Sequence, residues 1–167
     1  MISRRTFIQG SVLVGTIALP QLAAKTSERP PSLDRGLVNE FVKVAHTDLS
    51  AVQSMLDEQP HLLNASWDWG NGDFETAMGA AGHMGLKDTA LYLLDKGARA
   101  DIFVLTMLGK TDLVKGMLDL YPNLLESYGP HGFTLLHHAK QGGEDAAGLV
   151  EFFQSKGLND MHRKIFQ

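Results

Sequence analysis

The sequence predicts an all-helical protein made of about four stacked helix pairs. Two observations support this prediction: blocks of residues recur along the chain at a long interval, and apolar residues within each block recur at helical spacing. The 167 residues include no cysteine and carry a net charge of −4, so we expect one domain that is stabilised by packing alone. A mildly acidic chain gains nothing from phosphate backbones, and nucleic acid is therefore not an expected partner.

The segment 1–24 has the layout of an export signal. A head that contains Arg4 and Arg5 precedes an apolar run over 11–19, and two alanines follow at 23–24. The apolar run is about half of the roughly 20 residues that a membrane-spanning helix needs, which disfavours a permanent anchor. The small residue usual three places before the cut is missing, so incomplete cleavage stays open. An ordinary N-terminal helix is the other alternative.

Residues 3–9 read Ser-Arg-Arg-Thr-Phe-Ile-Gln, and this segment resembles the twin-arginine (Tat) export signal. Arg4, Arg5 and Phe7 match the family motif Ser-Arg-Arg-x-Phe-Leu-Lys, whereas the two positions after Phe7 depart from it. The resemblance implies a signal peptide over 1–24 and export of a folded protein to the periplasm, with only transient membrane contact.

The chain after the signal divides into three predicted parts. Residues 25–36 are polar and contain two consecutive prolines, which is typical of an extended linker. A repeat domain is predicted over 37–161, and a short tail over 162–167.

Two blocks of the domain repeat each other closely. The pattern Val-x-x-Met-Leu-Asp-x-x-Pro-x-Leu-Leu occupies positions 52–63 and recurs at positions 114–125. Its apolar spacing predicts a helix with one apolar face, and its proline ends that helix because the residue before a proline leaves helical geometry. Gly97 and Gly157 are predicted to end the corresponding helices of the other two units in a left-handed conformation. One helix pair cannot bury its faces alone, so the pairs must stack.

Residues 72–101 resemble an ankyrin repeat along their whole length, and 131–139 resemble the opening of another. They match the family pattern G-x-T-P-L-H-x-A-A-x-x-G and its continuation to L-L-x-x-G-A-D. The units are anchored on the helix-breaking positions Thr47, Gly85, Gly109 and Gly143, whose intervals are unequal and shortest between Gly85 and Gly109. The mean interval is close to the roughly 33 residues of the family. The resemblance implies an all-α ankyrin-repeat solenoid of about four helix-turn-helix repeats.

The unequal intervals predict unequal loops. The long first junction contains Trp67 and Trp69 and the dipeptide Asn71–Gly72, which predicts a tight hairpin turn. The second junction leads into Ile102 with hardly any loop, so the third repeat is predicted to lack its hairpin.

No pattern in the sequence predicts catalysis, a metal or a cofactor. The chain lacks Gly-x-Ser-x-Gly, Ser-x-x-Lys and His-Glu-x-x-His, and its histidines show no recognisable metal-ligand spacing. We therefore expect a protein that is not an enzyme, with no catalytic, metal-binding or cofactor-binding residues. A structural role for His137 is implied by its place in the family's T-P-L-H turn. One catalytic alternative stays open, a small periplasmic hydrolase that uses Asp68, His83 or His131.

The resemblance implies binding of a protein partner through hairpin tips and the concave helix face. The candidate contact residues are Trp67, Asp68, Trp69, His83, Met84, His131 and His138. Aromatic residues on a projecting loop commonly anchor interfaces, which favours the two tryptophans. They can instead cap the first repeat by packing on Phe41 or Val44, and an extended segment would point both rings to one side.

The sequence does not identify the partner. We expect a monomer apart from its partner. A narrower hypothesis is an accessory or protective factor for an exported enzyme, and a further alternative is an inert solenoid of the cell envelope.

Overall fold

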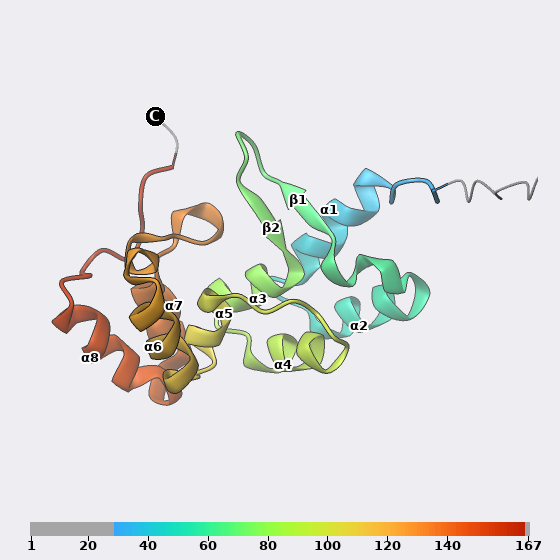
Figure 1. The fold of residues 1–167 in the computed structure, drawn as a ribbon. Coiled ribbons are helices and arrows are strands. Elements are labelled where there is room, and N and C mark those ends of the chain that lie inside the picture. The colour runs from blue at the N-terminus through green and yellow to red at the C-terminus, as the bar shows by residue number, and fades with distance from the viewer. Residues whose placement is uncertain (1–28, 166–167) are drawn as a thin grey trace, which may run out of the picture. The chain divides into compact units, whose positions relative to one another are not determined.

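The computed structural model describes residues 29–165, and those from Ser32 onward form one compact unit. Eight α-helices in the described residues follow one another in four antiparallel pairs (Figure 1). The pairs are α1 (Arg35–Val44) with α2 (Leu49–Glu58), α3 (Ala77–Met84) with α4 (Lys87–Asp95), α5 (Ile102–Met107) with α6 (Thr111–Leu120), and α7 (Leu135–Gly142) with α8 (Ala147–Ser155). The predicted, mostly helical architecture is confirmed.

The first helices of the four pairs form the spine of the stack. Helix α1 contacts α3, α3 contacts α5, and α5 contacts α7, while each second helix packs on its own partner. One hydrophobic core lies around α1 to α4 and includes Phe41, Leu62 and Leu93; a second lies around α5 to α8 and includes Leu149 and Phe153. Helix α5 contributes to both cores, so burial is continuous from one helix pair to the next.

Short polar and glycine signals set the helix ends. The Thr76 side chain accepts from the Gly79 amide at the start of α3, and Thr134 does the same for the His137 amide at the start of α7. Gly85 and Gly109 take left-handed φ values of 73° and 64° at the turns inside the second and third pairs.

The predicted helix stops are also found. Gly97 and Gly157 both have φ 89° just after α4 and α8. The 3₁₀ turns Pro60–Asn64 and Pro122–Glu126 follow α2 and α6, where the repeated proline stops each helix.

We expect Gly109→Ala to destabilise the fold far more than Gly97→Ala. Both glycines have positive φ, so alanine costs about 1 kcal/mol at either position. A Cβ at Gly109 would also lie 2.1 Å from the Asp145 carbonyl oxygen, whereas a Cβ at Gly97 would meet nothing within 4 Å. Overpacking should add about 2 kcal/mol at Gly109. Urea denaturation of the two variants measures the difference, and equal midpoints would contradict this packing.

The long first junction forms a two-stranded antiparallel hairpin. Strand β1 (Ser66–Asp68) pairs with β2 (Phe74–Thr76), with Trp67 opposite Glu75. The turn has positive φ at Asn71 (55°) and Gly72 (84°), and the Asp73 amide donates to the Gly70 carbonyl at 3.1 Å. These are the features of a type I′ turn, so the predicted tight turn is confirmed.

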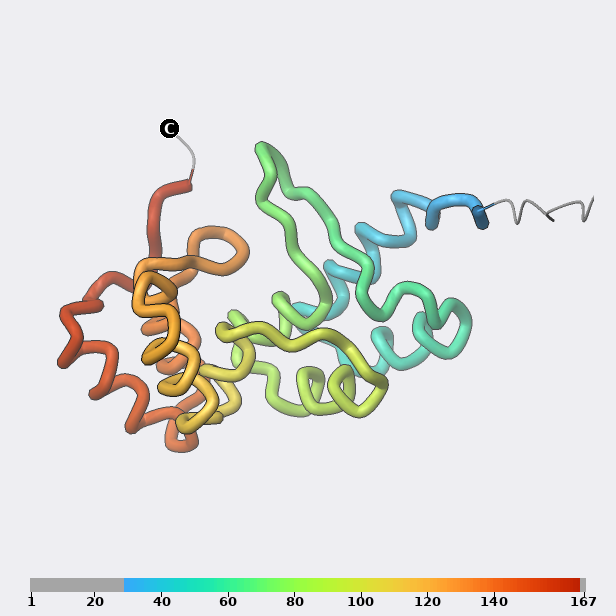
Figure 2. Tube along the Cα trace, viewed as in Figure 1, coloured from blue at the N-terminus to red at the C-terminus, as the bar shows by residue number. Residues whose placement is uncertain are grey.

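Figure 2 traces this hairpin as it projects beyond the helices. The chain between α4 and α5 forms no strand, as the short second junction predicts.

The ends of the described region differ slightly from the predicted boundaries. Helix α1 begins at Arg35, two residues before the predicted start, because Asp34 caps it by accepting from the Leu37 amide. Part of the predicted tail is attached to the body, since the Arg163 amide donates to the Gly132 carbonyl at 2.8 Å. The export-signal residues Arg4, Arg5 and Phe7 lie outside the described residues. Across 29–165, no helix combines the length and the apolar character that crossing a membrane requires.

Candidate metal centre

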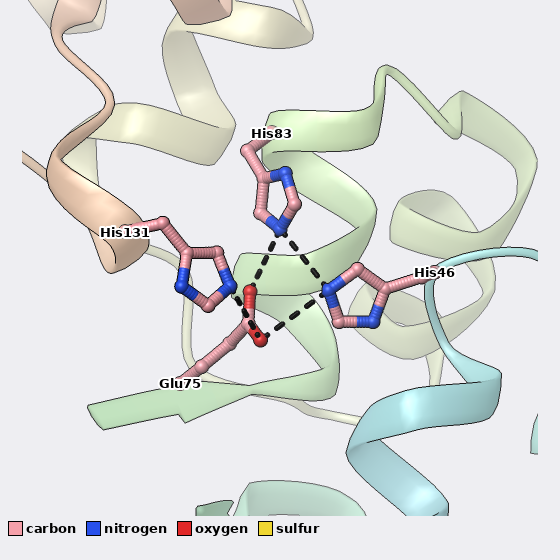
Figure 3. Close-up of side chains that lie close together, drawn as sticks. All are labelled: His46, Glu75, His83 and His131. Atoms are coloured by element: carbon pink, nitrogen blue, oxygen red, sulfur yellow. Dashed lines mark hydrogen bonds and ion pairs between the residues drawn. The ribbon is translucent and has the colours of Figure 1, made fainter. Parts of the chain in front are cut away.

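Four side chains from separate parts of the stack converge at one point (Figure 3). His46 follows the end of α1, Glu75 lies in β2, His83 lies in α3, and His131 lies in the turn before α7. Each offers one potential ligand atom, and these atoms all lie within 4.8 Å of one another. The sequence, which shows no recognisable metal-ligand spacing, did not predict this convergence.

The end of α1 orients His46. Carbonyls in the last turn of a helix lack intrahelical partners, and Nδ1 of His46 donates to the carbonyl of Val42 at 2.9 Å. With the proton on Nδ1, the lone pair of Nε2 points at the centre. Hydrogen bonding to the Glu75 carboxylate raises the pKa of His46. This effect is larger than that of burial, which lowers the pKa. The carboxylate thus favours a cation at Nε2 of His46, which is a proton when no metal ion is bound.

Asp73, at the end of the hairpin turn, orients His131. Its Oδ2 accepts from Nδ1 of His131 at 2.8 Å and its Oδ1 accepts from the His131 amide at 2.9 Å. His131 itself has φ 58°, an uncommon conformation for a residue with a side chain. Such strain is often found at functional sites, and a carboxylate that holds the second nitrogen of a histidine is common around metals. Nε2 of His131 faces Glu75 at 3.4 Å.

Glu75 is the buried acid of the cluster, with no exposed side-chain surface. Its Oε1 accepts from Nε2 of His83 at 2.8 Å, and its Oε2 accepts from Nε1 of Trp69 at 2.7 Å. Burial would raise the pKa of Glu75, but hydrogen bonds and charge from His46 and His83 outweigh it and lower the pKa to about 2. The cluster therefore contains a carboxylate that stays ionised at neutral pH.

His83 forms the buried side of the cluster. Only 5% of its side chain is exposed, and the ring of Phe133 stacks on it with centroids 5.1 Å apart. The backbone carbonyl of His83 accepts from Nε2 of His137 at 2.8 Å, so α7 holds the end of α3 in place. Nε2 of His83 lies 3.2 Å from Nε2 of His46.

Three of the six ligand-to-ligand distances match the edge of a tetrahedral metal site. Atoms bound at roughly 2.0–2.1 Å to a tetrahedral zinc ion lie about 3.3 Å from one another. Nε2 of His46 lies 3.2 Å from Nε2 of His83 and 3.4 Å from Oε2 of Glu75, and Nε2 of His131 lies 3.4 Å from the same oxygen. Two imidazole nitrogens at this distance need a proton or a cation between them, because their lone pairs repel.

The donor set narrows the choice of ion. Imidazole suits zinc, copper, iron and nickel, whereas calcium and magnesium prefer oxygen ligands. Three imidazoles with one carboxylate therefore suit a divalent transition metal. Asp68 does not join this set: its Oδ1 accepts from the amides of Gly70 and Gly72 and stabilises the hairpin turn.

The structure turns both tryptophans inward. Trp67 packs on the first hydrophobic core, with the Arg35 guanidinium 5.5 Å from its ring centroid, and Trp69 donates to Glu75. The loop was predicted either to contact a partner or to cap the first repeat. The geometry fits the cap for Trp67, whereas Trp69 contacts the histidine cluster. Both rings lie on the face that also carries Glu75, as an extended segment predicts.

The other predicted contact residues differ in how far they are exposed to solvent. His83 and His138 are 5% and 1% exposed, so neither offers surface to a partner. Met84 is 44% exposed and Asp68 is exposed at the hairpin, whereas His131 is partly exposed within the cluster.

Sequence reasoning missed His46 and Glu75. The four ligands are widely and unevenly separated along the chain, which matches no short metal motif. One signal was available: His46 and His83 stand one and two residues before Thr47 and Gly85, the helix-breaking positions of the first two repeats. Comparisons with family models, with curated proteins and with solved structures find no match.

His138 lies outside the cluster and gives an expected pH dependence of stability. Burial lowers its pKa from 6.5 to about 4, and its Nδ1 donates to the Thr134 carbonyl at 2.8 Å. Between these two pKa values the unfolded chain binds a proton that the folded chain does not, so stability falls as pH falls from about 6.5 to 4, by about 3 kcal/mol.

Urea denaturation across this range, with a chelator present, measures the effect. His138→Asn should flatten the pH profile, because the amide can keep the bond to Thr134 without titrating. The control is the exposed His61→Asn, which should leave the profile unchanged. A profile for His138→Asn as steep as that of the wild type would contradict the assignment.

Proposed function

We propose that this protein is an exported, ankyrin-type binding protein that holds one divalent transition metal on His46, Glu75, His83 and His131. Zinc is the first candidate. The observation that carries the proposal is the convergence of four ligand atoms within 4.8 Å, three of whose separations match the edge of a tetrahedral site. The proposal replaces the expectation of a protein without metal or cofactor.

The surroundings of the ligands support metal binding over a plain ion-pair network. Nδ1 of His46 and Nδ1 of His131 each donate to an acceptor outside the cluster, which directs both Nε2 lone pairs inward. An ion pair needs only one histidine against Glu75. Three neutral imidazoles and one carboxylate offer more donor atoms than one ion pair uses, and a divalent cation matches this donor set better.

Isothermal titration of the full chain with zinc, followed by elemental analysis, tests the proposal. We expect one ion per chain. His83→Ala and His131→Ala should each lower the affinity by at least about tenfold. The control is His61→Ala, an exposed histidine outside the cluster, which should bind as the wild type does. Absence of saturable binding by the wild type, or equal affinity in the His83 and His131 variants, would overturn the proposal.

The ankyrin part of the proposal rests on the match between repeat pattern and helix pairs. The four helix-breaking positions used to anchor the repeats each lie between the two helices of one pair: Thr47, Gly85, Gly109 and Gly143. The hairpin that precedes α3 also lies where the family pattern places one. These features support a repeat stack of this type.

Export through the twin-arginine route is proposed from Arg4, Arg5 and Phe7. Changing both arginines to lysine keeps the charge but removes the motif, so we expect the variant to remain in the cytoplasm. Cell fractionation and immunoblotting of the wild type and the variant measure this. Unchanged export of the double variant would refute the assignment.

A second candidate function is the binding of a protein partner, either in a general scaffold or as an accessory factor for an exported enzyme. The exposure of two aromatic residues favours it: Phe74 at the hairpin is 62% exposed and Tyr128 is 51% exposed, and both line a cavity of about 350 Å³ beside Asp101. Affinity capture from periplasmic extract with the wild type and Phe74→Ala tests this candidate. Identical captured proteins would remove Phe74 from a binding role.

A further inference from the structure

We infer that the metal centre keeps one exchangeable coordination position on its solvent-facing side, between His46 and His131, and that a small anion binds there. The inference rests on the proposed metal site, because the anion would bind to the ion itself. It adds a ligand class that the four protein ligands alone do not imply.

The cluster is open on one side only. The side chains of His46 and His131 are 21% and 31% exposed, whereas those of Glu75 and His83 are 0% and 5% exposed. The two exposed imidazoles are also the most widely separated. The ring centroids of His46 and His131 lie 6.4 Å apart, whereas the centroid of His83 lies 5.0 Å from that of His46 and 5.3 Å from that of His131. Figure 3 shows these two rings on opposite sides of the centre.

Trp69 forms a wall beside this opening. Its ring centroid lies 6.2 Å from that of His46 and 5.9 Å from that of His131, and its Nε1 donates to Oε2 of Glu75 at 2.7 Å. The hydrogen bond fixes the indole against the carboxylate. An incoming ligand must therefore fit between two imidazoles and a flat aromatic ring, which favours a small one.

Charge favours an anion. The ion and its direct ligands, one carboxylate and three neutral imidazoles, carry a net charge of about +1, which the Asp73 carboxylate behind His131 offsets from a longer distance. Partial burial strengthens the attraction of the ion to a counterion that binds it directly. The nearby Asp73 carboxylate directs both oxygens to His131, and its side chain is 5% exposed, so it does not fill the opening. Four-coordinate zinc sites sometimes expand to five ligands, and an added anion would take the fifth position here. The ligand class is therefore a small monoanion, such as a short carboxylate.

Cobalt replaces zinc as a spectroscopic probe in the test. The full chain is loaded with Co²⁺, its binding is quantified by elemental analysis, and its visible spectrum is recorded during titration with azide. We expect a saturable change of the cobalt bands with one ion retained per chain. Failure to bind Co²⁺ or Zn²⁺ would overturn the proposed function. Two results would overturn this inference and leave the metal site in place. In the first, the protein binds cobalt but azide does not change its spectrum; in the second, azide removes the cobalt from the protein.

A comparison of a small anion with a large one tests whether the Trp69 ring limits the size of the ligand. Acetate should change the cobalt spectrum of the wild type at concentrations about tenfold lower than benzoate does, because benzoate collides with the indole. Trp69→Ala should reduce this preference, whereas Trp69→Phe, which keeps a ring but loses the hydrogen bond to Glu75, should retain it. If the wild type accepts both anions equally, or if Trp69→Ala keeps the preference while retaining cobalt, the wall is not at Trp69.

Discussion

Saturating zinc is expected to raise the thermal midpoint of the wild-type protein strongly. The four ligands come from the turn after α1, from β2 and α3, and from the turn before α7, so only the folded chain brings them together. An ion present at a hundred times its dissociation constant stabilises the folded state by about 2.7 kcal/mol. For a domain of this size that corresponds to a rise of roughly 6–12 °C.

Differential scanning fluorimetry with zinc and with chelator measures the shift. His83→Ala should show no zinc-dependent shift, and His61→Ala should show the full one, because His61 is exposed and lies outside the cluster. An identical midpoint for the wild type with and without zinc would show that the metal does not link these parts of the chain.

Among substitutions that keep the size of the side chain, Glu75→Gln is expected to lower stability and zinc affinity the most. The amide keeps the size of the side chain but replaces a buried carboxylate that accepts from Trp69 and His83. One amide oxygen cannot serve both donors, and the charge that balances His46 is lost. Breaking a buried charged network in this way should cost about 3 kcal/mol in stability, and it should also reduce zinc affinity strongly.

Chemical denaturation with chelator present isolates the effect on stability, and titration with zinc gives the affinity. Glu58→Gln is the matched control, because Glu58 is exposed at the end of α2. If Glu75→Gln is as stable as Glu58→Gln, the carboxylate does not contribute to the fold as its contacts indicate.

The helical organisation was predictable because its determinants are local. Pro60 and Pro122 end helices through the geometry of the residue before them, and Asn71–Gly72 forms the hairpin turn because both residues tolerate positive φ. The sequence also predicted which junction would carry a hairpin, since loop length alone decided it.

The burial of the predicted contact residues was less predictable. His138 stood at a position that the resemblance assigns to the concave face, yet it is 1% exposed, and Trp69 faces the histidine cluster instead of solvent. Periodicity predicts the face of a helix or strand, but it does not predict what packs on that face. The neighbour of Trp69 is decided by the long junction folding back over α3.

Local sequence was sufficient to predict the helix pairs, their ends and the hairpin turn, because each depends on residues within a few positions of one another. The meeting of His46, Glu75, His83 and His131 became visible only in the folded chain. It depends on α1 packing on α3, on the hairpin register that turns Glu75 inward, and on Asp73 binding His131 across a separation of 58 residues. The first and the last of these are long-range contacts, and no local spacing of the ligands predicts that all three occur together.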